Sequence, residues 1–456
     1  MEASGARGEL DHPGRVPLLE ELHARPAPRF GAPALVLHLA LAQPAAPAVR
    51  DRGDDERQLR ALTGAGDEPP GAGDEPPGDG ARHHVFRRGA WEVTWESHTE
   101  FTSYTAVRPQ PDGGNGSGLP TADPFAGDTA DVFPPEWEAA DPATRVAAVA
   151  VAVLPLPSTP EQVVEQASAW LDPDVTLITR VLGGAAVLAG DFRADGQGYT
   201  RFVLFVPPDI GPGRVGRTVQ RVVELETYRS LAMLGFVESQ QLGARLTAID
   251  PQLLHLVSQL DEPEQPGEQL LHELLSVTAE LEGLAMAHDF RFGATGAYAA
   301  IVDDRLSGLA EERFLGRQTL REFLARRYLP AIRTVTSLED RLGRMLERAG
   351  RAADLLRTKV DVERAAQNQS LLHSMDARAE TQLRLQHTVE GLSVVAISYY
   401  ALGLLGYLLA PVVEEAGISK VWLMAALAPL VILGTWLGMR RVRARIHDQA
   451  RTRPHS

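Results

Sequence analysis

The feature that most constrains this chain is a pair of uncharged apolar runs near its carboxyl end. The first run covers 391–413 and the second covers 421–439, and only the short segment EEAGISK lies between them. As a helix, the first run would be roughly 34 Å long, which is enough to cross a hydrocarbon core of about 30 Å. The sequence therefore predicts a transmembrane hairpin at 391–439, and a buried helical hairpin in a soluble domain is the alternative.

The charged residues that flank the two runs predict the orientation of the hairpin. Four arginines follow the second run: Arg440, Arg441, Arg443 and Arg445. The connecting loop carries Glu414, Glu415 and a single lysine. Because arginine-rich flanks stay on the inner side of a membrane, we expect a multi-pass protein with its N- and C-termini in the cytoplasm. The basic tail at 440–456 would then lie on the anionic head groups of the lipid bilayer.

Composition excludes several classes of partner and chemistry. The net charge is −15, which argues against nucleic acid as the main partner. The chain contains no cysteine, so disulfide bonds and thiolate catalysis are excluded and a reducing compartment fits. The first residues, MEASGARGELDHPGR, lack the apolar segment that secretory signals require, so we expect most of the chain to stay in the cytoplasm.

Residues 15–207 have the pattern of an α/β or α+β domain, which we expect on the cytoplasmic side. Apolar or alternating runs predict strands at 34–42, 91–107, 145–154, 175–182, 185–192 and 199–206. The segment at 161–171 has helical periodicity. Two segments rich in proline, glycine and acidic residues interrupt the strands, at about 51–82 and 108–143, and are predicted to be disordered insertions.

The pattern changes to helical periodicity in 215–388. Helices are predicted at 218–234, 267–289, 309–329 and, as the longest element, 337–386. The longest helix carries apolar residues at alternating spacings of four and three: Leu338, Leu342, Met345, Ala349, Ala352 and Leu356. This coiled-coil-like pattern predicts packing against other helices. Neither glycine nor proline occurs between Gly350 and Gly391, so the helix is expected to continue into the first apolar run.

Four polar residues would lie on one stripe of the first apolar helix. At 100° per residue, Glu390, Ser393, Tyr400 and Tyr407 fall within about 100° of one another. Such a stripe should face protein or water rather than lipid. One interpretation is a pore in a ring of subunits, with Glu390 at the inner mouth and Glu414 and Glu415 at the outer mouth. The other interpretation is a seam between helices.

Motifs of known chemistry are weak in this chain, and we predict no catalytic residue and no metal ligand set. GPGRVG at 211–216 matches the glycine pattern of dinucleotide-binding loops, but no second strand with an acidic residue follows, so a loop before a helix is the better interpretation. His98 and Glu100 are expected to share one face of a strand, which supplies too few ligands for a metal. HELLS at 272–276 lacks the second histidine of a zinc-protease helix.

Several longer segments resemble one bacterial family. They include HPGRVPLLEELHARP, WESHTEFTSYT, RRYLPAIRTVTSLEDRL and the run from LLRTKVDVERAAQNQ to LGLLGY. These residues resemble the uncharacterised membrane-anchored proteins grouped as domain of unknown function three-four-two-two. The resemblance implies a location in the bacterial inner membrane, and because the family has no established activity it implies no catalytic residues.

The order of elements also resembles CorA-type magnesium channels, although GYLLAP stands where that family has Gly-Met-Asn. This looser resemblance implies a divalent cation such as magnesium as the transported ion. Three functional hypotheses follow. The first is a non-enzymatic homo-oligomer whose cytoplasmic domain binds or organises a partner and is anchored by the hairpin. The second is a CorA-like cation channel or transporter, and the third is an enzyme tethered to the membrane.

Overall fold

The computed structural model of the protein describes residues 12, 15, 27–43, 50–64, 82–109, 123–127, 129–140, 143–261, 266–409 and 419–451. The chain divides into two compact units, which are described separately. The first unit comprises residues 1–265 and 272–353, and the second comprises residues 266–271 and 354–456. The domain boundaries predicted above follow a different division of the chain and stay a prediction.

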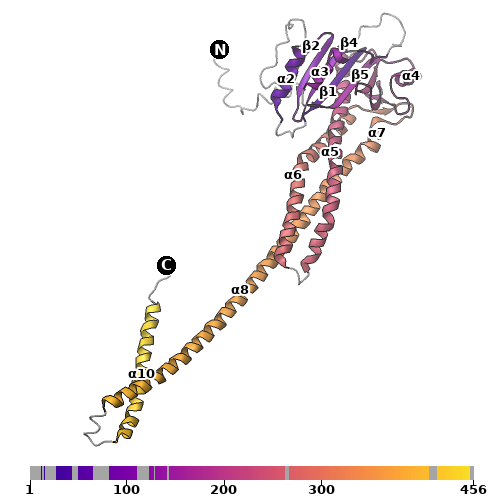
Figure 1. Ribbon diagram of the computed structural model, residues 1–456. Helices are drawn as coiled ribbons and strands as arrows, with labels where there is room; N and C mark the ends of the chain where they lie inside the picture. The colour runs from indigo at the N-terminus through magenta and orange to yellow at the C-terminus, as the bar shows by residue number, and fades with distance from the viewer. Residues whose placement is uncertain are drawn as a thin grey trace. The chain divides into compact units, whose positions relative to one another are not determined.

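A nine-stranded mixed sheet lies at one end of the first unit, and long helices extend from it (Figure 1). Its strands are β1 (Ala34–Ala42), β2 (His83–Arg88), β3 (Trp91–Ser97), β4 (Phe101–Pro109), β5 (Thr144–Pro155), β6 (Leu177–Val181), β7 (Ala186–Ala194), β8 (Thr200–Val206) and β9 (Glu312–Arg313). Their order across the sheet is β2-β3-β4-β1-β5-β8-β7-β6-β9. β5 and β8 run parallel, and the other neighbouring strands run antiparallel.

The sheet consists of two halves that follow each other in the sequence and have a similar order of strands and helices. β1, helix α2 (Arg52–Thr63) and β2 to β4 form one half, and β5, helix α4 (Pro160–Trp170) and β6 to β8 form the other. The two halves meet where β1 pairs with β5. In each half the first strand pairs with the last, so the middle of the sheet is formed by strands that lie far apart in the sequence.

Alternation along β1 separates the two faces of the sheet. Leu35, Leu37, Leu39 and Leu41 pack in one apolar cluster with residues of α2 and of α3 (Pro135–Ala139). Val36 belongs to the cluster on the opposite face. That face is covered by α5 (Pro212–Ser258), by the end of α6 (Gly267–Gly308) and by α7 (Leu320–Arg327). His38 shares the face of Val36 because side chains two residues apart point the same way.

The structure corrects the prediction of disorder in parts of the two insertions. α2 lies within 51–82, and its Leu59 and Leu62 are buried in the core. α3 lies within 108–143, and its Trp137 is buried and donates a hydrogen bond of 2.9 Å from Nε1 to the carbonyl of Gln58. A few apolar side chains at helical spacing are enough for docking when a sheet offers an apolar face. The proline- and glycine-rich stretches at 65–81 and 110–122 lie outside the described residues.

Two predicted elements are divided in the structure. The single run predicted at 91–107 is the hairpin of β3 and β4, with a turn at 98–100. The helix predicted at 309–329 is interrupted, because Ala310, Leu315 and Gly316 have positive φ angles, which a helix cannot accommodate. α7 begins only at Leu320, after Thr319 forms a capping box with Glu322.

Helices α5, α6 and the first part of α8 (Leu329–Leu408) lie side by side in the first unit (Figure 1). Thr295 of α6 donates to the carbonyl of Ala232 in α5, and Arg341 of α8 donates to Asp250 of α5. The apolar residues Leu342, Met345, Ala349 and Ala352 of α8 are buried. The predicted order, in which a mixed sheet domain precedes long helices and two apolar helices, is confirmed.

The second unit contains the rest of α8 and α10 (Lys420–Arg451). Both helices are long and apolar enough to cross a membrane, judged by length and composition. They contact each other: Ser398 and Thr435 share a hydrogen bond of 2.6 Å, and Gly406 lies against Met424. Length and composition alone are weak evidence for a bilayer, so the transmembrane hairpin stays a prediction.

Candidate functional site

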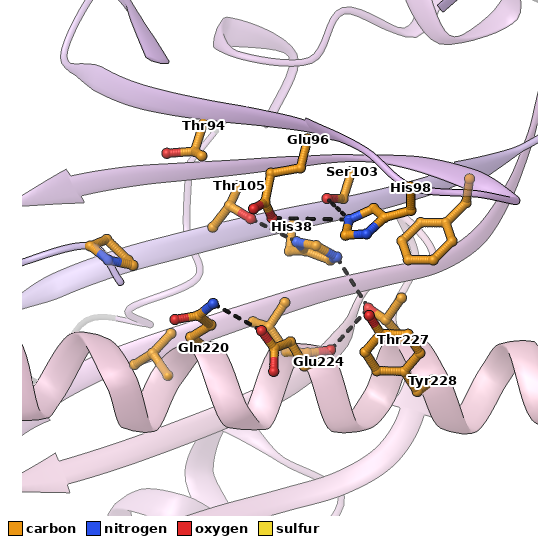
Figure 2. Close-up of a pocket in the computed structure, with 14 residues that line it drawn as sticks. His38, Thr94, Glu96, His98, Ser103, Thr105, Gln220, Glu224, Thr227 and Tyr228 are labelled. Carbon is orange, nitrogen blue, oxygen red and sulfur yellow. Dashed lines mark hydrogen bonds and ion pairs between the residues drawn. The ribbon is translucent and has the colours of Figure 1, made fainter. Parts of the chain in front are cut away.

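A polar cavity interrupts the apolar contact between the sheet and α5. It has a volume of about 60 Å³ and lies between α5 and the strands β1, β3 and β4 (Figure 2). Single waters need only ~10–15 Å³ of such space. Its walls carry hydroxyl, imidazole, amide and carboxylate groups from both sides. Polar groups at a buried interface require hydrogen-bond partners. The hydrogen bonds that the lining side chains already make therefore determine which polar groups remain available to a ligand.

His38 forms the floor of the cavity and is held in one tautomer. The hydroxyl of Thr227 on α5 donates to the carbonyl of Val223 at 2.9 Å, so its oxygen must accept from Nε2 of His38 at 3.1 Å. Nδ1 of His38 then accepts from the hydroxyl of Thr105 at 2.8 Å. Burial, with a contribution from His98, lowers the pKa of His38 to about 3. The imidazole is therefore neutral and clamps β1 and β4 to α5 (Figure 2).

His98, in the turn after β3, forms the wall of the cavity. Its ring stacks on Phe101 with the ring centres 4.2 Å apart. Its Nε2 lies 3.2 Å from Oγ of Ser103 and 4.0 Å from a carboxylate oxygen of Glu96 (Figure 2). In a nucleophilic triad, the serine and the carboxylate contact different ring nitrogens. Here both contact Nε2, and Ser103 is buried, so the geometry fits binding better than nucleophilic catalysis.

The helix side of the cavity is also fixed by hydrogen bonds. Gln220 donates to Glu224 at 2.8 Å, and Glu224 forms an ion pair with Arg305 of α6. Tyr228 lies one turn further along α5 and lines the same cavity (Figure 2). Because these side chains are already held in place by the protein, a ligand would meet a preorganised wall.

A second, larger cavity adjoins the first and shares His98, Phe101 and Tyr228 with it. Its volume is about 270 Å³, and its other walls include Arg52, Arg82 and Tyr298. Glu100 lies beside it as a buried carboxylate. Arg291 of α6 lies 3.0 Å from one oxygen of Glu100, and the Tyr298 hydroxyl donates to the other at 2.8 Å.

We expect the substitution His38→Gln to change the pH dependence of stability. The pKa of His38 is lower in the folded state than in the unfolded state. Between the two pKa values, the unfolded state therefore binds a proton at His38 and the folded state does not. This histidine therefore contributes stability above its ordinary value of 6.5 and loses it as the pH falls from 6.5 toward 3, by up to about 1.4 kcal/mol per pH unit. In thermal unfolding measured in detergent, the stability of His38→Gln should fall less steeply than that of the wild type as the pH is lowered below 6.5. The exposed control His373→Gln should keep the wild-type slope, and equal slopes in all three would contradict the assignment.

Comparison with known proteins identifies the family. The family model described as Protein of unknown function (DUF3422) matches residues 10–446. The chain belongs to the DUF3422 family. No curated protein and no solved structure gave a match. The family recognised from the sequence segments above is confirmed, whereas the architectural resemblance to CorA-type channels finds no support.

The structure describes all four residues of the predicted stripe in this DUF3422 protein. Tyr400 and Tyr407 are 71% and 83% exposed, and the hydroxyl of Ser393 donates to the carbonyl of Val389 in its own helix. Glu390 lies 3.9 Å from His387. The contact with α10 involves Ser398 and Gly406, and the side chain of Glu390 is 26% exposed. Pore lining and a seam between helices both stay predictions.

The remaining charged candidates are only partly described. Glu414 and Glu415 lie outside the described residues. Arg440 lies over the ring of Trp436 at 5.4 Å, and Arg441 is exposed. Arg443 and Arg445 belong to α10, but their side chains lie outside the described residues. The lipid contact of these four arginines therefore stays a prediction.

The glycine motif at 211–216 has a packing role in this DUF3422 protein. Gly211 is the N-cap of α5, and a Cβ at Gly216 would lie 1.7 Å from the carbonyl oxygen of Pro28. Gly216 therefore lets the segment around Pro28 cross the helix closely. Within the described part of the chain, no group of three His, Asp or Glu residues could hold a metal ion.

Sequence reasoning placed His98 and Glu100 on one strand and missed most of the cavity. The structure places both in the turn between β3 and β4, where His98 lines the cavity and Glu100 pairs with Arg291. The available signal was His38, a single polar residue inside the apolar strand ALVLHLALA. A buried polar residue in such a strand demands partners, but the sequence does not show that Thr105 and Thr227 supply them.

Proposed function

We propose that this DUF3422 protein is a membrane-anchored binding protein that associates with copies of itself and has no catalytic role. The apolar helices at its carboxyl end anchor it in the bacterial inner membrane, and its sheet domain holds a small polar ligand reversibly. One observation carries the anchoring. Apolar side chains cover the outer surface of both helices and remain exposed, among them Leu392, Val395, Leu404, Val421 and Leu430.

A bilayer is the environment that suits this surface. Each Å² of apolar surface left in water costs roughly 25 cal/mol, so a continuous exposed apolar helix pair is unfavourable in water. Lipid tails remove that cost, and helices satisfy their own backbone hydrogen bonds. The hydrogen bond between Ser398 and Thr435 keeps both hydroxyls away from lipid, as expected for polar side chains in a helix pair.

The proposed orientation places both termini in the cytoplasm. The contact of Arg440 with Trp436 supports an interface at that end of α10, because tryptophan and arginine gather where lipid meets water. The arginines from Arg440 onward would then lie close to anionic head groups. The loop with Glu414 and Glu415 would lie on the outer side.

The binding role rests on the two adjoining cavities of the sheet domain. The polar groups of the smaller cavity are fixed by hydrogen bonds between α5 and the strands, and His38 is kept neutral. A rigid wall with convergent polar groups is the common form of a small-molecule site. The contacts at Nε2 of His98 lack the arrangement of a nucleophilic triad.

Self-association is proposed through the part of α8 that precedes the first apolar run. Seven positions there are spaced alternately by four and three: Leu371, Met375, Arg378, Gln382, Leu385, Val389 and Leu392. Met375 is 63% exposed, and the other apolar members are exposed too. The flanking positions of this heptad pattern are uncharged: Leu372, Ser374, Ala379, Thr381, Gln386 and Thr388. Identical parallel helices would therefore meet no like charges at these flanking positions, and within the seam only Arg378 would face a like charge, that of its copy.

Fractionation tests the anchoring. The full-length protein should stay in the membrane pellet after extraction with alkaline carbonate and dissolve only in detergent. Protease added to sealed spheroplasts should leave the sheet domain intact, since we place it inside. Release by carbonate, or digestion of the amino-terminal part from outside, would refute the proposal.

A further inference from the structure

We propose that the larger cavity, lined by Arg52 and Arg82, binds the oxyanion of a small ligand, either a carboxylate or a phosphate group. This inference rests on the binding role proposed above and names the chemical class of the ligand. Arg52 is the first residue of α2, and Arg82 directly precedes β2. Both line the same cavity of about 270 Å³, so two cations from separate segments converge on one space.

Within the described residues, neither Arg52 nor Arg82 has an acidic partner, unlike the other arginines in and beside α2. Arg50 pairs with Asp55, Arg57 with Asp54, and Arg60 with Glu56. Within the described part of the chain, no carboxylate lies within ion-pair distance of Arg52 or Arg82. Two guanidinium groups that line one cavity, and that have no carboxylate partner among the described residues, suit the oxygens of an external anion.

The frame of the cavity is rigid where the arginines face it. Arg50 and Asp55 form an almost fully buried ion pair, and Arg50 also donates to the carbonyl of His98. The start of α2 is thereby fixed against the turn after β3, which contributes Ser97, His98 and Thr99 to the cavity wall. Arg52 follows Arg50 by two residues, so its backbone position is determined by the same contacts.

The carboxylate of Glu100, which lies beside the cavity and does not line it, is not expected to repel an anion. Glu100 is neutralised by Arg291 and accepts a hydrogen bond from the Tyr298 hydroxyl. Burial, together with that hydrogen bond, raises the pKa of Tyr298, so the phenol stays uncharged. Phe101, Tyr228, Tyr298 and Ile301 add uncharged side chains to the cavity wall.

These features define the ligand by its chemistry. A guanidinium group offers a planar fork of donors that matches carboxylate and phosphate oxygens in bidentate geometry. The side chains of Tyr228 and Phe101 at the junction with the smaller cavity suit the uncharged body of a compact molecule. The smaller cavity, with its hydroxyl groups and neutral His38, would receive an uncharged polar end.

Direct binding to the full-length protein in detergent tests this proposal. Inorganic phosphate and succinate are titrated separately by calorimetry, so the two arms distinguish a phosphate site from a carboxylate site. At least one of them should bind. Arg52→Gln and Arg82→Gln should each weaken its Kd by at least about tenfold, and the double variant should abolish binding. Arg82→Lys keeps the charge but loses the fork, so it should bind more weakly than wild type.

Arg57→Gln is the matched control, because Arg57 lies on the same helix but pairs with Asp54. It should bind as the wild type does. All these arginines are exposed, so the melting temperature of each variant without ligand should stay unchanged, which separates lost binding from lost folding. Absence of binding to both anions by the wild type, or an unchanged Kd in the double variant, would overturn the proposal. Carbonate extraction of the membranes from which each variant is purified reports the membrane anchoring independently.

Discussion

A chain with the single substitution Met375→Cys is expected to form a disulfide-linked dimer in membranes under mild oxidation. Met375 is exposed on α8 and occupies a core position of the heptad pattern from Leu371 to Leu392. In a parallel, in-register pair of helices, the same core position of both chains meets at the seam. The protein contains no native cysteine, so between two copies of this chain the introduced thiol can pair only with its counterpart.

His373→Cys is the matched control for this experiment. His373 lies two residues earlier and on the outer side of the same heptad pattern, so its copy in the partner helix should be out of reach. Non-reducing gels should show most of the Met375→Cys protein as dimer and little of the His373→Cys protein. Equal cross-linking at both positions, or none at Met375→Cys, would contradict a parallel pairing of this segment.

The substitution Glu100→Ala is expected to destabilise the sheet domain strongly. The side chain of Glu100 is 3% exposed and is the carboxylate partner of Arg291 and of the Tyr298 hydroxyl. Its removal leaves the phenol without its acceptor and leaves the largely buried guanidinium with the more distant Glu238, 3.8 Å from its Nε, which costs about 3 kcal/mol. Thermal unfolding of the full-length protein in detergent should therefore begin roughly 10 °C lower.

Two further variants distinguish the lost ion pair from a general effect of truncation. Glu92→Ala removes an exposed carboxylate from the neighbouring strand β3 and should change the unfolding free energy by less than about 0.5 kcal/mol. Glu100→Gln keeps the shape and an acceptor for Tyr298, so its melting temperature should lie between those of the wild type and Glu100→Ala. A melting temperature of Glu100→Ala equal to that of Glu92→Ala would contradict the role assigned to the pair.

Strands whose two faces are both covered could be predicted from the sequence, because their apolar runs are continuous. The predicted strand at 34–42 coincides with β1, and the one at 145–154 differs from β5 by a residue at each end. β2 and β9 could not be predicted, since β2 is short and rich in charge and β9 has only two residues. Their pairing depends on β3 and β6, which lie elsewhere in the chain.

The candidate site could be predicted only in fragments. His38, the turn after β3 and the helix residues around Glu224 come from three separate segments, and no local spacing relates them. Pairing of β1 with β4 and coverage by α5 bring them together. The prediction that His98 and Glu100 share a strand face assumed an uninterrupted strand, and the turn at 98–100 sends the two side chains to different partners. The periodicity of apolar residues was therefore enough to predict helices and strands. The site could not be predicted in the same way, because it depends on tertiary contacts between distant segments.

The borders of the sheet affect how this protein can behave at high density. An open sheet offers backbone groups along its outermost strands to any further strand, which is a common route to aggregation. Here one border is β2, whose sequence HHVFRR places basic side chains there, and the other is β9, with only Glu312 and Arg313. Short and charged borders discourage the growth of a shared sheet between molecules. When many copies lie close together, they would therefore associate through their helices. Edge-to-edge pairing of their sheets, which leads to fibres, would be disfavoured.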